Sequence, residues 1–227
     1  NPEEKNFNVY KFLDIPEVKS VNILAEGVPE KDSIYLRKYA ENNNKYVPGP
    51  SSLGGIYSGT MRLGNTAGKN ENILKNKLEH FGKVGLVTKS GGILNEFINF
   101  LNINGYHINQ AIAVGGDRYP CLKLADVALM YQKDESIDFI IMIGEEGGID
   151  ELSVANMVNN NIITKNVIAW CSGISSDYLS EDIEFGHAGA SANHKYEKAS
   201  FKNKLMKELG VLVPDSFESI KEIIDRS

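Results

Sequence analysis

The sequence has few cysteines and no long hydrophobic run. Cys121 and Cys171 are the only thiols among 227 residues, too few for a disulfide framework, so both are predicted to be reduced and the protein cytoplasmic. The longest central apolar run, Phe139–Ile143, is far shorter than the ~20 residues that span a bilayer. The segment Asn1–Lys5 lacks the basic and then apolar pattern of a signal peptide. We therefore expect no membrane partner.

Positive charge is also scarce and scattered. Asp and Glu number 30 against 24 Lys and Arg, a net charge of −6, and no basic block could follow a phosphate backbone. Nucleic acid is therefore an unexpected partner. The sequence has neither the His/Cys/Asp spacing of a zinc site nor a P-loop. It thus predicts no bound metal and no ATP hydrolysis by this chain alone.

Hydrophobic residues make up 42% of the chain and charged residues 24%, which is enough apolar material for a sizeable core. Short apolar runs alternate with helix-period segments, the pattern of a doubly wound α/β fold with a parallel sheet. Strands are predicted at Ser20–Ala25, Lys45–Val47, Lys83–Val87, Gln110–Val114, Phe139–Ile143, Val167–Cys171 and Val211–Val213. Helices are predicted at Glu30–Glu41, Ile93–Asn102, Leu122–Gln132, Ile149–Asn159, Glu197–Leu209 and Phe217–Asp225.

The spacing of the predicted strands and helices divides the chain into three parts. Residues 1–48 hold a single βαβ unit, too small for its own sheet, which we interpret as the last part of a truncated Rossmann-type domain. Residues 49–82 are rich in Gly, Ser and Asn and are predicted to connect two units. Residues 83–227 hold a complete doubly wound domain of five strands.

Glycine-rich turns follow the predicted strands, where ligands bind in open parallel sheets. Ser90-Gly91-Gly92 precedes a helix, so its N–H groups suit either an anion or a plain capped turn. Glu145 and Glu146 follow the strand Phe139–Ile143, where they would orient a ligand or simply be solvated near the next helix. His187, among small residues, is either a nucleophile or base, with Glu145 fixing its tautomer, or a structural histidine in a turn.

Taken together, these motifs resemble the α subunit of the succinyl-CoA synthetase superfamily. The matching motifs are Gly49-Pro50, Lys89-Ser90-Gly91-Gly92, Gly115-Gly116-Asp117, Gly144-Glu145-Glu146-Gly147-Gly148 and Gly186-His187-Ala188-Gly189-Ala190. The likeness runs from about residue 18 to the C-terminus. The segments Gly54-Gly55-Ile56, Asn95-Glu96, Asp117-Arg118-Tyr119-Pro120 and Trp170-Cys171 are more similar to the ATP-citrate lyases of that superfamily. Its ligase domain is flavodoxin-like, and we expect that fold for residues 83–227.

The resemblance implies a role for each matching residue. His187 would be the phosphohistidine that passes a phosphoryl group from ATP to citrate, and Glu145 the acid that hydrogen-bonds the imidazole. The phosphoryl group would be held by Ser90, Gly91 and Gly92, with Gly92 leaving room for the acid. Asn95 and Glu26 fall where the family contacts substrate, and Leu24, Ala25 and Glu26 where it meets CoA.

The same resemblance implies partners. CoA and Mg-ATP would be substrates, with ATP and Mg bound mainly by an ATP-grasp part that this sequence lacks, as it lacks the citrate-synthase-like lyase part. The chain would be inactive alone and belong to an oligomer. Thr88-Lys89 and Glu146 depart from the family, which usually has Ser-Arg and Ile there. Three alternatives stay open: a succinyl-CoA synthetase-like ligase, a citryl-CoA synthetase subunit without lyase activity, and a non-catalytic acyl-CoA-binding module.

Overall fold

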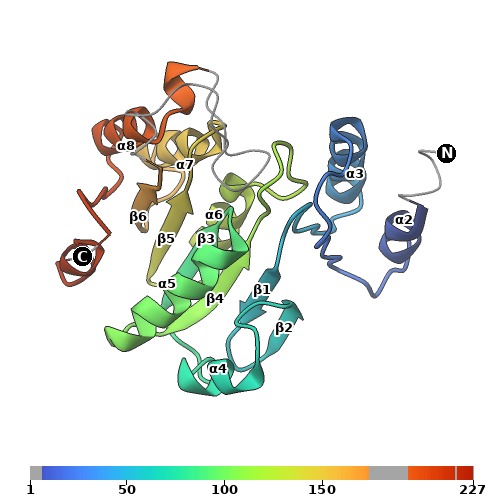
Figure 1. Ribbon diagram of the computed structural model, residues 1–227, viewed down its shortest axis with the longest axis horizontal. Helices are drawn as coiled ribbons and strands as arrows, with labels where there is room; N and C mark the ends of the chain where they lie inside the picture. Colours follow the sequence, from blue (N-terminus) through green and yellow to red (C-terminus); the bar gives the residue numbers. More distant parts are fainter. Residues whose placement is uncertain (1–6, 174–193, 218, 227) are drawn as a thin grey trace.

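The computed structural model describes residues 7–173, 194–217 and 219–226, and contains one six-stranded sheet (Figure 1). The strands are β1 (Gly54–Tyr57), β2 (Met61–Gly64), β3 (Val84–Thr88), β4 (Ile108–Ala113), β5 (Phe139–Gly144) and β6 (Asn166–Cys171), in the order β2-β1-β4-β3-β5-β6. β4, β3, β5 and β6 are mutually parallel, whereas β1 is antiparallel to both neighbours. The sheet is thus mixed but mostly parallel.

Central strands are buried on both faces, which explains their unbroken apolar sequence. In β5, Ile140 and Met142 pack into one core, whereas Ile141 and Ile143 pack into the other. One core lies under α6 (Leu124–Lys133), α7 (Asp150–Asn159) and α8 (Ala199–Glu208), and the second under α5 (Gly91–Ile103) and α9 (Ile220–Ile224) (Figure 1). Helices on both faces confirm the doubly wound α/β prediction.

Residues 49–82, predicted to connect two units, contain strands and a helix that the sequence analysis did not predict. This segment forms β1, β2 and α4 (Asn70–Lys75), and β1 pairs with β4 from Gly54↔Ala113 to Tyr57↔Gln110. The glycine-rich sequence hides the strand, yet Gly55 is needed there: a Cβ would lie 2.8 Å from the carbonyl oxygen of Ala111. The boundaries at 48 and 82 remain predictions.

Three predicted strands are reduced to single bridges. Ser20–Ala25 and Lys45–Val47 share one parallel bridge, Ser20↔Tyr46, and Val211–Val213 contributes only Leu212↔Ile168. Backbone bonds continue around the first bridge, from Ile23 N to Pro48 O at 2.9 Å, but Pro48 has no N–H to return. Ser20–Ala25 and Lys45–Val47 therefore pair only over this short stretch. The five strands predicted for residues 83–227 correspond to the four strands β3, β4, β5 and β6 and to the bridge Leu212↔Ile168.

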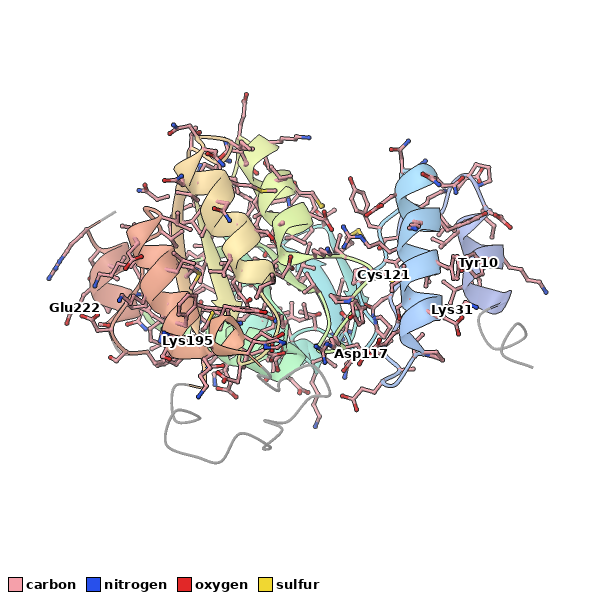
Figure 2. The ribbon with its side chains drawn as sticks, turned by 90° about the horizontal axis from the view of Figure 1, so that it is seen from above. Tyr10, Lys31, Asp117, Cys121, Lys195 and Glu222 are labelled. Carbon is pink, nitrogen blue, oxygen red and sulfur yellow. The ribbon has the colours of Figure 1, made fainter. Side chains whose placement is uncertain are left out.

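The N-terminal helices pack beside the sheet domain around a small separate core. α2 (Phe7–Leu13) and α3 (Glu30–Asn42) contribute Leu13, Leu36 and Ala40, and the sheet domain contributes Cys121. Figure 2 shows Cys121 on the side that faces α3, where its Sγ lies 3.5 Å from the carbonyl oxygen of Ser33. Throughout the described residues, helices are too short or too polar to cross a membrane.

Candidate active site

The loops that follow the four parallel strands meet at one edge of the sheet. Lys89 and Ser90 follow β3, the loop from Gly115 to Pro120 follows β4, the loop from Glu145 to Gly148 follows β5, and Ser172 follows β6. Because parallel strands share one carboxyl edge, residues from four distant parts of the sequence lie together there.

A cleft of about 540 Å³ opens at this edge, between the sheet domain and α3. Lys89 and Glu145 line it from the sheet domain, and Arg37 lines it from α3. Figure 2 shows Asp117, another lining residue, at the junction of the two parts. Arg37 also joins the parts through an ion pair with Asp126 of α6 at 3.3 Å. The cleft therefore has walls from both units predicted from the sequence.

Glu145, which lines the cleft, is held firmly in place. Only 6% of the residue is exposed. Its backbone N–H donates to Glu151 Oε1 at 3.3 Å, and its carbonyl oxygen accepts from Lys202 Nζ at 2.6 Å. A buried carboxylate fixed at both of its peptide groups is suited to orient a ligand, so the alternative of a solvated Glu145 is wrong.

Glu151 lies between two lysines. Its Oε1 is 3.2 Å from Lys89 Nζ, and its Oε2 is 3.0 Å from Lys202 Nζ. Burial raises the pKa of Glu151, but the two ammonium groups outweigh it and the pKa is lowered. Burial likewise lowers the pKa of Lys89, but Glu151 and Glu145 outweigh it and the pKa is raised. Glu151 and Lys89 are therefore charged at neutral pH, and Lys89 brings positive charge to the cleft.

Glu146 is buried and has a structural role. Its Oε2 accepts the N–H of Ala199 at 2.7 Å, the first residue of α8. Gly147 N–H also donates to Glu197 O at 3.0 Å, in the short 3-10 helix η2 (Lys195–Glu197). Glu146 thus favours a helix N-terminus, as one interpretation of the sequence held, but that of α8 rather than the next helix, α7.

The turn Ser90-Gly91-Gly92 begins α5, with Ser90 as the residue before the first helical one. The Ser90 hydroxyl makes no capping hydrogen bond to the helix, so the interpretation of this segment as a plain capped turn is wrong. Gly91 is buried against Leu53, whereas Gly92 is exposed. First-turn N–H groups of a helix carry partial positive charge, and this turn directly follows Lys89 in the chain.

Asn95 does not share the cleft with Glu145. Its Oδ1 accepts the N–H of Ala67 at 2.8 Å, and it lines a separate pocket of about 220 Å³ beside Asn72 and Lys75 of α4. The structure thus separates two residues that the sequence analysis assigned to one reaction.

Leu24, Ala25 and Glu26 are exposed and lie against the turn at Ser51. Glu26 Oε1 accepts from Ser51 Oγ at 2.9 Å, and Ala25 O accepts from Ser51 N at 2.8 Å. The Ser51 carbonyl oxygen in turn accepts from Gly116 N at 3.3 Å, in the loop after β4. This contact brings the predicted CoA-binding segment to the same edge of the sheet. His187 lies outside the described residues.

Sequence reasoning missed Glu151 and Lys202. Both occupy core-facing helix positions: Glu151 shares its face with Val154 and Ala155, and Lys202 shares its face with Ala199 and Met206. A charge at an apolar helix position is a detectable signal, because it requires a buried partner. Among the described residues, there is no group of three or more His, Cys, Asp or Glu side chains that could hold a metal ion.

Comparison with known proteins gives a consistent result. The family model described as CoA-ligase matches residues 87–212. The chain is 39% identical to a probable ATP-citrate synthase of Caenorhabditis elegans, over 93% of this chain and 19% of that protein. It is 40% identical to ATP-citrate synthase beta chain protein 1 of Arabidopsis thaliana, over 94% of this chain and 36% of that protein. The chain therefore spans about a fifth to a third of these relatives.

Among solved structures, the chain is similar to Methanosaeta concilii ATP citrate lyase, a D541A mutant in complex with (3S)-citryl-CoA. That match has a TM-score of 0.95 and 39% identity, and covers 99% of this chain and 36% of the other. A dinucleotide-forming acetyl-coenzyme A synthetase 1 of Ca. Korarchaeum cryptofilum matches with a TM-score of 0.65 at 14% identity, which shows a shared fold only.

Proposed function

We propose, from the premise that the chain belongs to the CoA-ligase family, that it is the part of an ATP-citrate lyase that carries a phosphohistidine at His187 and forms citryl-CoA. The chain is homologous to the CoA-ligase part of those enzymes. The observation that carries the proposal is the fixed, buried Glu145 beside Lys89 in a cleft at the carboxyl edge of the sheet. The citryl-CoA in the similar Methanosaeta concilii structure supports the choice of product.

The first step would form the phosphoenzyme. An imidazole nitrogen of His187 attacks the γ-phosphorus of ATP, an N–P bond forms, and the P–O bond to ADP breaks. Glu145 would accept a hydrogen bond from the other ring nitrogen and fix the tautomer. Ser90, Gly91 and Gly92 would direct N–H groups at the phosphoryl oxygens, where charge-assisted bonds are about twice as strong as neutral ones.

The next steps would consume the phosphoryl group. A citrate carboxylate oxygen attacks phosphorus, the N–P bond breaks, and citryl phosphate forms. The CoA sulfur then attacks the acyl carbon, a C–S bond forms, and inorganic phosphate leaves as the thiol proton is released. Gly92 would leave room for the acid. Asn95 would contact the acid through its amide nitrogen, because its oxygen is engaged by Ala67.

The proposed partners follow from the family resemblance and from the fact that this chain spans only part of its relatives' length. Mg-ATP, as substrate, would be bound mainly by an ATP-grasp subunit or domain, and CoA would lie along Leu24, Ala25 and Glu26. Cleavage of citryl-CoA would fall to a citrate-synthase-like lyase domain. We propose an oligomeric, cytoplasmic enzyme.

The test is transfer of labelled phosphate from ATP in the presence of the ATP-grasp partner, followed by a chase with an acid and CoA. We expect label on the wild-type chain and none on His187→Asn, whereas His194→Asn, a change to an exposed histidine, keeps it. Glu145→Gln should slow labelling without removing the acceptor. Discharge by citrate supports the proposal.

Other outcomes have defined meanings. Discharge by succinate alone would indicate the succinyl-CoA synthetase-like alternative, and discharge by citrate without later cleavage a citryl-CoA synthetase. Label on His187→Asn would show that another residue is the nucleophile. Absence of label with a bound partner would indicate a non-catalytic module.

A further inference from the structure

We propose that Lys202 and Glu151 are positioning residues that act together on Glu145, and that phosphorylation depends on Lys202 through Glu145. This inference rests on the proposed function of Glu145. Both side chains are fully buried, at 0% exposure, so neither can touch a substrate in the cleft. They belong to α7 and α8, on either side of the connection that contains β6.

The three donors of Lys202 are all used. Its Nζ donates to Glu145 O at 2.6 Å, to Gly147 O at 3.0 Å and to Glu151 Oε2 at 3.0 Å. A lysine ammonium has three N–H groups, so this set leaves none over. One cation therefore draws together two carbonyl groups that are two residues apart and sets the curvature of the loop.

Glu151 completes the arrangement from the other side. Its Oε1 accepts the N–H of Glu145 at 3.3 Å, so both peptide groups of Glu145 are bound by members of one ion pair. We call the Lys202–Glu151 pair with these three bonds to Glu145 and Gly147 the loop clamp. Gly147, within the clamp, and Gly148, directly after it, have φ of +85° and +63°, a backbone conformation that favours glycine.

Stability alone does not account for the loop clamp. Apolar residues of similar volume often replace a buried ion pair without loss of stability, so such a pair is weak evidence for stabilisation. Apolar side chains cannot, however, bind peptide N–H and C=O groups and so fix the backbone of one residue. The clamp also extends to the cleft, because Lys89 Nζ contacts Glu151 Oε1 at 3.2 Å and donates to Gly147 O at 3.0 Å.

The test is a double-mutant cycle on the rate of phosphorylation by labelled ATP, in the chain with its ATP-grasp partner. Lys202→Met should lower the rate by about 10- to 100-fold, the usual effect of removing a partner that orients an active group. In the Glu145→Gln background the same change should alter the rate by less than about twofold, because its effect passes through the carboxylate. Lys204→Met, an exposed lysine on the same helix, is the matched control and should change neither rate.

The hydrogen-exchange rate of the amides from 145 to 148 measures how firmly the loop clamp holds the backbone, and it does not depend on phosphorylation. It should be faster in Lys202→Met and unchanged in Lys204→Met. Lys202→Gln, which keeps two donors, should fold and give intermediate exchange and an intermediate rate even if Lys202→Met does not fold. The inference would be overturned if Lys202→Met lowered the phosphorylation rate by the same factor in the Glu145→Gln background as in the wild type. A wild-type rate, or wild-type exchange, in folded Lys202→Gln and Lys202→Met would overturn it as well.

The proposed function fails separately. If the wild-type chain takes no label with a bound partner, the assignment of His187 and Glu145 is wrong, and the catalytic part of this inference falls with it. Faster exchange in the Lys202 variants would then still support the loop clamp.

Discussion

Gly91 lies directly against the side chain of Leu53, so that a Cβ built on Gly91 would come within 2.8 Å of Leu53 Cβ and overlap the atoms beyond it. The next residue, Gly92, is exposed, and the nearest atom to its Cβ would be Ser90 Oγ at 3.8 Å. Two adjacent glycines in the first turn of α5 thus have opposite environments.

We expect Gly91→Ala to destabilise the chain and Gly92→Ala not to. Gly91→Ala should cost about 1–3 kcal/mol, because Leu53 must move at its Cβ and not only at its tip. Gly92→Ala should be neutral or stabilise by up to about 1 kcal/mol, since alanine loses less entropy in a helix. Urea unfolding of the two variants checks this, and equal effects would contradict it.

Truncation tests how the chain divides. The two cores around the sheet contain no residue before Ile56, so a chain of residues 49–227 should fold cooperatively. A chain of residues 83–227 should aggregate, because it loses β1, leaves the edge of β4 unpaired, and removes Ile56, Ala67 and Leu78 from a core. Circular dichroism melting and size-exclusion chromatography separate these outcomes. Cooperative folding of the shorter chain would support the predicted boundary at residue 82.

Glu151→Gln should destabilise the chain more than Lys202→Met does. The first change leaves two buried ammonium groups without their carboxylate, at a cost of about 3–5 kcal/mol. The second leaves Glu151 paired with Lys89, so about 1–3 kcal/mol for unsatisfied carbonyl groups is expected. Urea unfolding at pH 7 measures both, and the reverse order would contradict the assignment.

Acid should reduce the difference between the wild type and Glu151→Gln. The ammonium groups hold the folded-state pKa of Glu151 below its ordinary 4.5, despite burial, so its contribution to stability is present above that pH. That contribution is lost as pH falls through the lowered pKa. The unfolding free energies of the two chains should therefore differ at pH 7 and converge as the pH falls below 4.5.

Alkali should destabilise the chain partly through Cys121. Burial raises the pKa of its thiol from 9.0 to about 12, so the unfolded chain releases this proton first. Stability is therefore complete below about pH 9 and declines as pH rises towards 12, and Cys121→Ala should show a shallower decline. Burial also raises the pKa of Cys171, and neither thiol should react with iodoacetamide at pH 8 until the chain is unfolded.

The sequence predicts the parallel part of the sheet well because local and tertiary preferences agree there. In β5 every position is apolar, and such a run has few alternatives to a strand buried on both faces. β1 was missed because Gly54 and Gly55 carry no apolar signal, and their reason for being glycine is a neighbouring strand distant in sequence.

The candidate site was predicted in part. Glu145 could be found because a carboxylate after a buried strand is conspicuous, and its strand places it at the edge of the sheet. Its support could not be found in the same way, because Lys202 meets Glu145 only when α8 packs on the sheet, 57 residues further along the chain. Asn95 follows Ser90 closely in sequence but lines another pocket, so its predicted contact with substrate stays a prediction.

The shared edge of the four parallel strands separates what must stay fixed from what is free to vary. One wall of the cleft comes from α3 and the others largely from the loops after β3, β4 and β5, while the hydrogen-bonded ladder beneath holds these loops at a constant spacing. A residue exchanged in one of these loops therefore reshapes one part of the cleft and leaves the rest in place. Preference for a larger or smaller ligand can thus change in single steps, with the folded framework carried over intact.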